Sequence, residues 1–180
     1  MSQPKKQNWD KVLAISTTVI ALVAVVVSIW QGIETRKHNR LSVKPILDLV
    51  YVNKYEPEKT YPGIYLENYG VGPAIIKEVI VKLDGKPYYK SGNVFYFDFI
   101  GGYLRKDLIG DTKVLATSIG INMTLPKGEK LSLVTFMTKD QTPGVEKELV
   151  RLLNGLAIYI TYQSVYGETF KLVFSAKTLK

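Results

Sequence analysis

An uncharged run of 19 residues near the N-terminus, from Val12 to Trp30, constrains this chain more than any other feature. As an α-helix it would extend about 28 Å, close to the ~30 Å hydrocarbon core of a bilayer. A buried helix of a soluble domain would carry a polar face, but only four hydroxyl residues interrupt this run. A secretory signal has a shorter apolar region and a small-residue cleavage site, which this run lacks. The run therefore predicts a transmembrane helix over 12–30.

The two tryptophans, Trp9 and Trp30, flank this run and are 21 residues apart. That spacing is about 31 Å along a helix, which would place one ring in each headgroup region. Basic residues continue outward at both ends: Lys5, Lys6 and Lys11 on one side, and Arg36, Lys37 and Arg40 on the other. We expect the tryptophans and the second basic cluster to lie at the membrane interface.

These features divide the chain into four parts. A basic N-terminal tail occupies 1–11, the span 12–30, and a juxtamembrane stalk 31–42, which could continue the helix. Residues 43–180 remain as a body of about 140 residues, long enough for one domain with its own core.

The body is rich in residues that favour strands and turns. It holds most of the 12 Tyr, 6 Phe and 14 Gly. Alternating or β-branched segments predict strands that begin near Ile46, Ile64, Ala74, Asn93 and Leu156, and turn signals fall at Asp84-Gly85 and Pro126–Gly128. The predicted hairpin pairs 156–165 with 169–175. One short helix is predicted from Pro143 to Asn154, with Thr142 as its N-cap and Gly155 as its C-cap. Six to eight strands with one helix predict an all-β antiparallel sandwich or barrel.

Three motifs give the chain a resemblance that spans most of its length: H-N-R-L-S-V-x-P at His38–Pro45, N-x-G-x-G-P-A at Asn68–Ala74, and Y-x-x-x-Y-G-x-x-F at Tyr162–Phe170. On these motifs the chain resembles a broad group of small, mostly uncharacterised bacterial membrane proteins. The resemblance implies an N-terminal transmembrane helix followed by an immunoglobulin-like β-sandwich. Some comparably built proteins serve bacterial antiviral systems as membrane effectors, but the motifs identify a fold better than an activity.

The second motif has a structural interpretation that needs no ligand. Gly70 and Gly72 allow positive φ or a β-bulge. Asn68 can bond its own backbone, and Pro73 ends strand pairing. We therefore expect a specific turn at this point.

The residue inventory argues against most catalytic chemistry. The chain has no cysteine, which excludes disulfides, zinc–thiolate sites and cysteine nucleophiles. Its only histidine, His38, lies in the basic juxtamembrane cluster, and Ser42 lacks the elbow motif of a nucleophilic serine. The carboxylates are scattered, Asp98 is expected in solvent, and the Gly-rich segment 101–113 lacks phosphate-loop spacing. We predict no catalytic residue, no cofactor and no metal site.

The formal charge of +8 does not indicate nucleic-acid binding. Residues 1–40 contain six basic and two acidic groups, so half of the excess lies beside the bilayer. The body contains 18 basic and 14 acidic groups with the signs interleaved, and no RNA-binding signature. Anionic lipid is therefore a better partner for this charge than nucleic acid.

A stripe of small and polar residues follows a 3-4-3-4 spacing along the span: Ala14, Thr17, Ala21, Ala24, Ser28 and Gln31. Such a stripe lets helix backbones approach closely, and its hydroxyls can bond across the seam. The sequence therefore predicts a homo-oligomer joined through this face, although Ser16 and Thr18 fall off the stripe. A plain lipid-facing anchor remains the alternative.

These observations give three hypotheses for function. The first is a single-pass protein of the bacterial inner membrane whose β-sandwich is a non-catalytic binding or sensing module for a protein partner or a small ligand. The second is a membrane-perturbing effector whose body senses a ligand such as a nucleotide, with Thr17, Ser28 and Gln31 facing into a helix bundle. The third is an envelope enzyme. The larger basic cluster after the span favours a cytoplasmic body with an outward N-terminus.

Overall fold

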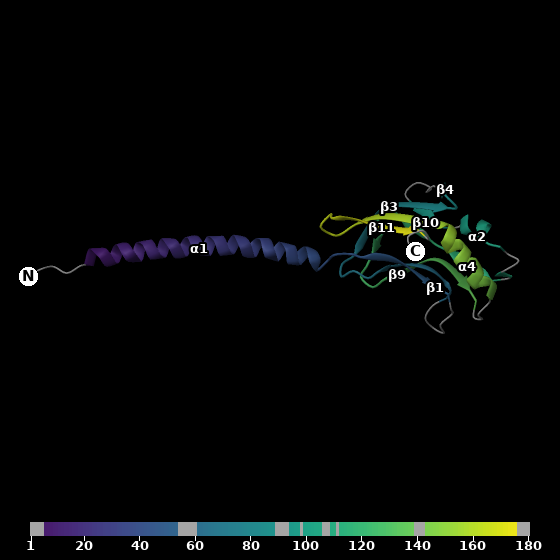
Figure 1. Ribbon diagram of the computed structural model, residues 1–180, viewed down its shortest axis with the longest axis horizontal. Helices are drawn as coiled ribbons and strands as arrows, with labels where there is room; N and C mark the ends of the chain where they lie inside the picture. The colour runs from purple at the N-terminus through teal and green to yellow at the C-terminus, as the bar shows by residue number, and fades with distance from the viewer. Residues whose placement is uncertain are drawn as a thin grey trace, which may run out of the picture. The chain divides into compact units, whose positions relative to one another are not determined.

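A computed structural model of the chain describes residues 6–53, 61–88, 94–97, 99–105, 109–110, 112–138 and 143–175. It divides into two compact units, Met1–Ser42 and Val43–Lys180. The first is a helix and the second a body built mainly of strands (Figure 1).

The first unit is one uninterrupted helix, α1, which runs from Lys6 to Leu41 over 36 residues. The expected span and stalk are therefore continuous. Most residues of the span are Val, Ile, Leu and Ala, whose side chains cannot form hydrogen bonds with the backbone. In lipid, every backbone N–H must therefore form its hydrogen bond within the helix. The helix ends in a turn at Ser42, whose N–H donates to the carbonyl of His38 at 2.9 Å.

The body contains two main antiparallel sheets. The first has the strand order β1-β2-β9-β6; these strands span Leu47–Val52, Gly63–Asn68, Lys130–Met137 and Lys113–Ala116. The second has the order β11-β10-β3-β4; these strands span Thr169–Ser175, Leu156–Gln163, Ala74–Leu83 and Lys86–Tyr88.

Shorter elements complete the body. Strand β8 (Thr124–Leu125) pairs with β3, and β5 (Val94–Tyr96) pairs with β7 (Ser118–Gly120). Helix α2 covers Phe99–Tyr103, and α4 covers Pro143–Gly155.

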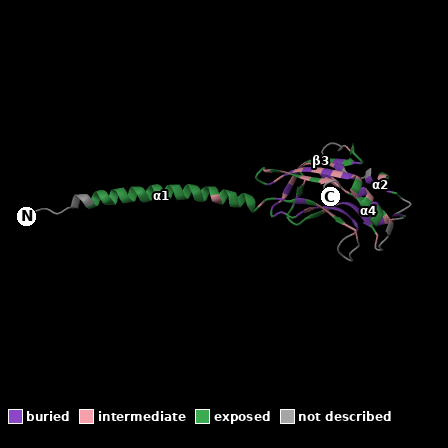
Figure 2. Cartoon of the chain, viewed as in Figure 1, coloured by how far each residue is buried: buried purple, intermediate pink, exposed green. Residues whose placement is uncertain are grey.

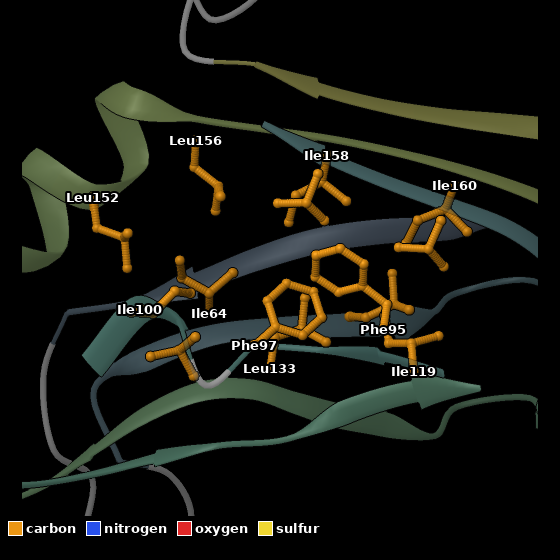
Figure 3. Packing of buried hydrophobic residues seen from close by; sticks show 14 of the residues in the cluster. Ile64, Phe95, Phe97, Ile100, Ile119, Leu133, Leu152, Leu156, Ile158 and Ile160 are labelled. Atoms are coloured by element: carbon orange, nitrogen blue, oxygen red, sulfur yellow. The ribbon is translucent and has the colours of Figure 1, made fainter. Parts of the chain in front are cut away.

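The buried hydrophobic residues of the described part of the body form a core between the two main sheets (Figure 3). In β10 every second residue is buried, ending at Tyr162, which is the period of a strand with one face on a core. Ile64 and Leu133 enter the core from the first sheet, and Phe95 and Phe97 pack edge-to-face between the layers, with ring centroids 5.0 Å apart. Helix α4 adds Leu152 to this cluster.

The structure confirms a long apolar N-terminal helix followed by mostly antiparallel strands. The Asp84-Gly85 turn is also confirmed, since both residues have positive φ (50° and 77°) and join β3 to β4. The predicted 156–175 hairpin forms as β10 and β11. Helix α4 begins at Pro143 as predicted, whereas Thr142 lies outside the described residues.

Three predictions about the body need correction. The strand expected over 93–99 is shorter, because β5 ends at Tyr96 and α2 begins at Phe99. Phe95 and Phe97 are buried as expected, but Asp98 lies outside the described residues. The body has a second helix, α2, besides the predicted one. The described residues form eleven strands rather than six to eight, because β4, β6 and β7 are short strands that the sequence did not indicate.

Candidate functional site

The apolar side chains of α1 are exposed along the helix (Figure 2). No residue in the most apolar part of α1 is buried, and Leu22 and Ile29 are 63% and 61% exposed. A helix that is apolar on every side needs an apolar environment, since burying one such side chain contributes about 1.5–3 kcal/mol. Among the described residues, α1 is the one helix long and apolar enough to cross a membrane.

The predicted interface residues are all exposed on α1. Trp9 and Trp30 are 69% and 66% exposed, and Arg36, Lys37 and Arg40 are exposed beyond them. His38 is exposed as well, and its Nε2 lies 3.4 Å from a carboxylate oxygen of Glu34 one turn earlier. Such an exposed pair contributes little to stability.

The stripe residues lie on one continuous helix, so their heptad spacing puts them along one side of it. The hydroxyl groups already have partners in their own helix. Thr17 donates to a carbonyl of the preceding turn, Ala14 at 2.9 Å or Leu13 at 3.0 Å, and Ser28 donates to Ala24 at 2.7 Å. Close packing is therefore the main interaction that this face offers to another helix.

The start of the body is held by Asn68, a side chain with no exposed surface. Its Oδ1 accepts hydrogen bonds from the backbone N–H groups of Ile46 (3.2 Å) and Gly70 (3.0 Å). Its Nδ2 lies within hydrogen-bonding distance of three carbonyl oxygens, those of Gly72 (2.8 Å), Leu125 (3.0 Å) and Pro126 (3.2 Å). One amide thus joins three segments of the body. We call Val43–Ile46, the first of these segments, the entry strap.

Two glycines allow the entry strap to lie directly on this turn. A Cβ on Gly70 would come 2.3 Å from the backbone nitrogen of Ile46, and one on Gly72 would come 2.0 Å from the carbonyl oxygen of Val43. Neither has a positive φ. Of the two alternatives, positive φ or a β-bulge, the first is therefore wrong: these positions require glycine because two backbone segments pass close together. The backbone N–H of Val71 also donates a hydrogen bond to the carbonyl oxygen of Lys44, at 3.0 Å.

The third motif lies in the second sheet, and its residues contact the entry strap and the residue that follows the strap. The backbone N–H of Leu47 donates to the phenol oxygen of Tyr162 at 3.3 Å. That ring stacks on Phe170 with centroids 5.6 Å apart, and the Lys44 ammonium lies 5.6 Å from the Phe170 centroid. The three motifs that carry the resemblance therefore contribute residues to one end of the body.

An ion pair at α4, between the buried Glu148 and the partly exposed Arg151, was not anticipated from the sequence. Glu148 is 1% exposed and accepts three hydrogen bonds from Arg151, the shortest at 2.7 Å, and one from the Arg105 backbone N–H at 3.0 Å. Burial alone would raise the pKa of this carboxyl, but the Arg151 and Arg105 hydrogen bonds hold it below its usual value. Arg151 also donates to the carbonyl of Tyr103 at 2.6 Å.

This ion pair has a structural role. It fastens the end of α2 to α4, and the Tyr103 hydroxyl reaches the Asp84 carboxylate at 3.0 Å. The Glu-x-x-Arg spacing on an amphipathic helix was the available signal, but sequence alone could not place Tyr103 and Arg105 beside it.

One hollow lies on the first sheet beside β6 and β9. Its volume is about 310 Å³, and it is lined by Leu115, Ala116, Thr117, Leu131, Ser132 and Thr135. An irregularity in the pairing of β2 with β9 puts Ser132 and Thr135 close together, with their hydroxyls 3.0 Å apart. The described residues that line the hollow provide aliphatic walls and hydroxyl groups, and none of them is ionisable.

Within the described ranges, no three His, Asp or Glu side chains gather into a possible metal site. The sequence matches no protein-family model and no curated protein.

Proposed function

We propose that this protein is a single-pass, membrane-anchored β-sandwich that works as a binding or sensing module without catalysis of its own. The observation that carries the proposal is α1, which exposes its apolar window completely and is joined to a body with a separate core. In this proposal the helix localises the protein, and the body binds a protein partner or a small ligand.

We assign the body to the immunoglobulin-like sandwiches. The orders β1-β2-β9-β6 and β11-β10-β3-β4 support this assignment. If β1, β2, β3, β4, β6, β9, β10 and β11 are named A, B, C, C′, D, E, F and G, the sheets read A-B-E-D and G-F-C-C′, as in that fold. The resemblance to small bacterial membrane proteins belongs to the same proposal.

Self-association through Ala14, Thr17, Ala21, Ala24, Ser28 and Gln31 is part of the proposed function. The positions of the charges support it. Arg36, Lys37 and Arg40 lie on the opposite side of α1 from the stripe by helical periodicity, so a seam along the stripe would not bring these cations together.

We place the protein in the bacterial inner membrane with its body in the cytoplasm, on the basis of the basic cluster that follows the span. A fluorescent reporter that matures only in the cytoplasm, fused after residue 180, should then be fluorescent. An active alkaline-phosphatase fusion at the same position would mean that the body faces outward.

The alternative is a membrane-perturbing effector with Thr17, Ser28 and Gln31 facing into a bundle. The hydroxyl protons of Thr17 and Ser28 are used inside the helix, which favours the module over a polar pore. Induced expression with a membrane-potential dye separates the two. If the protein is a binding module, the cells keep their membrane potential. If it is an effector, the same expression level depolarises them. A pull-down from solubilised membranes then identifies the partner.

A further inference from the structure

The stalk part of α1 carries its lysine and arginine residues on one face. Ile33, Arg36, Lys37, Arg40 and Leu41 follow the spacing i, i+3, i+4, i+7, i+8, which places them on one side of a continuous helix. We call this set the basic face. All five side chains are exposed, with Ile33 at 61% and Leu41 at 54%.

The opposite side of the stalk is uncharged. It carries Gln31, Thr35 and Asn39, and it continues the side of the small-residue stripe. The only carboxylate in the stalk, Glu34, lies at the edge of the basic face, three residues before Lys37, and its carboxylate is 3.4 Å from His38 Nε2. The stalk is thus divided lengthwise into a cationic, partly apolar face and a neutral polar face.

This division fits an anionic lipid surface. The stalk begins directly after Trp30, so its first turns leave the membrane through the headgroup region. Cations beside a membrane attract anionic headgroups, and long Lys and Arg side chains can reach back toward the phosphates. Ile33 and Leu41 add apolar surface on the same side.

We propose that the basic face binds anionic phospholipid headgroups and so selects anionic lipid around the point where the chain leaves the membrane. This inference rests on the proposed membrane anchoring and adds a lipid partner to it. It also favours the cytoplasmic side for the body, because the cytoplasmic leaflet is the one rich in anionic lipid.

Trp30 is the reporter for the test, because it lies one turn before Ile33 and two before Lys37 on the same side of the helix. The full-length protein with Trp9→Phe, which leaves Trp30 as the single tryptophan, is reconstituted into nanodiscs. The discs contain equal mole fractions of phosphatidylglycerol and phosphatidylcholine, and only one of the two lipids is brominated on the upper acyl chain. The quenching of Trp30 by each brominated lipid gives the local enrichment.

We expect phosphatidylglycerol to outnumber phosphatidylcholine near Trp30 by roughly five to one or more. The triple variant Arg36→Gln, Lys37→Gln, Arg40→Gln should lose this enrichment. The matched control, Lys5→Gln, Lys6→Gln, Lys11→Gln, removes the same charge from the other end of the helix and should keep it. Adding Thr35→Lys, His38→Lys and Asn39→Lys to the first triple variant restores the charge on the other side and should not restore the enrichment.

Equal quenching by the two brominated lipids in the unmodified stalk would overturn the lipid preference while leaving the anchor intact. Full recovery by the lysines on the other side would overturn the role of the face. If neither brominated lipid quenches Trp30, the membrane anchoring itself is wrong, and the inference with it.

Discussion

The side-chain oxygen of Asn68 accepts a hydrogen bond from the backbone N–H of Ile46 at 3.2 Å. Through this contact the turn after β2 holds the entry strap, and the Ile46 carbonyl in return accepts a bond from the N–H of Tyr69 at 2.8 Å. The backbone N–H of Leu47, the next residue, donates a hydrogen bond to the hydroxyl oxygen of Tyr162 in the second sheet. The first residues of the body are therefore bonded to both of its sheets.

Asn68→Ala should destabilise the body strongly. It removes a fully buried amide and leaves several backbone groups without partners, each costing about 1–3 kcal/mol when buried. We expect a loss of about 2–4 kcal/mol in the free energy of unfolding, measured by urea denaturation of residues 43–180. Asn154→Ala, at an exposed position of α4, is the matched control and should change stability little.

Gly72→Ala should disrupt the same end of the body for a steric reason. The new Cβ would lie 2.0 Å from a carbonyl oxygen of the strap, and neither can turn aside, because the backbone fixes the position of both. We expect a loss of about 3 kcal/mol or more, or failure to fold. Gly120→Ala is the control, because its Cβ meets nothing closer than Met123 at 3.8 Å. If thermal melts show the two variants to be equally stable, the close approach of the strap is wrong.

The contribution of Glu148 to stability should depend on pH. Its folded pKa lies below the ordinary value of 4.5, so the folded state favours the ionised form. The stabilisation is fully present above that ordinary value and is lost as the pH falls through the lower, folded pKa. Glu148→Gln should therefore lower stability by about 1–3 kcal/mol at pH 7, and the difference from wild type should shrink below pH 4.5.

Chemical denaturation from pH 7 to 3 measures this difference. Glu146→Gln, on the same helix but exposed, is the control and should show a small difference that does not follow this pattern. A Glu148→Gln difference that grows as the solution becomes acidic would contradict the sign of the pKa shift.

Ala21→Phe with Ala24→Phe should abolish self-association of the span. The large rings would separate two helices at the centre of the stripe, where association depends on close packing. Leu22→Phe with Val23→Phe places similar rings mainly on the lipid side and should be tolerated. A transmembrane association reporter measures both pairs. Equal signals would mean that the stripe is not the seam.

Thr17→Val with Ser28→Val should have the smaller effect. Both hydroxyls donate within their own helix, so the substitutions remove little interhelical bonding. Cross-linking in membranes should show a weakened or unchanged oligomer with normal insertion. A complete loss of the oligomer would show that hydroxyl bonds, rather than packing, hold the seam.

Local signals were enough to predict the long helix and the last hairpin. The uncharged run is visible without tertiary information, and the alternation in 156–163 is regular because one side of β10 faces the core. The turn at Asp84-Gly85 was equally legible, since Asp-Gly tolerates two positive φ values.

The rest depended on contacts between distant residues. Asn68 was expected to bond its own backbone, and it does so at Gly70, but its bonds to Ile46 and Leu125 join segments 22 and 57 residues away. The positive φ expected as one alternative at Gly72 was wrong for the same reason, because the local sequence does not show a close approach of two distant backbone segments. Helix α2 and the next two strands, β6 and β7, follow no clear period, and tertiary packing decides their structure.

The most direct test of the account is the behaviour of the full-length chain and of the body alone in an alkaline carbonate wash. Carbonate strips proteins that are held to membranes by charge, but not those that span the hydrocarbon core. The full-length protein should stay in the membrane pellet, whereas residues 43–180 should remain in the supernatant and give a β-rich circular dichroism spectrum. Release of the full-length protein would contradict the membrane anchor, and a helical spectrum of the body would contradict the sandwich.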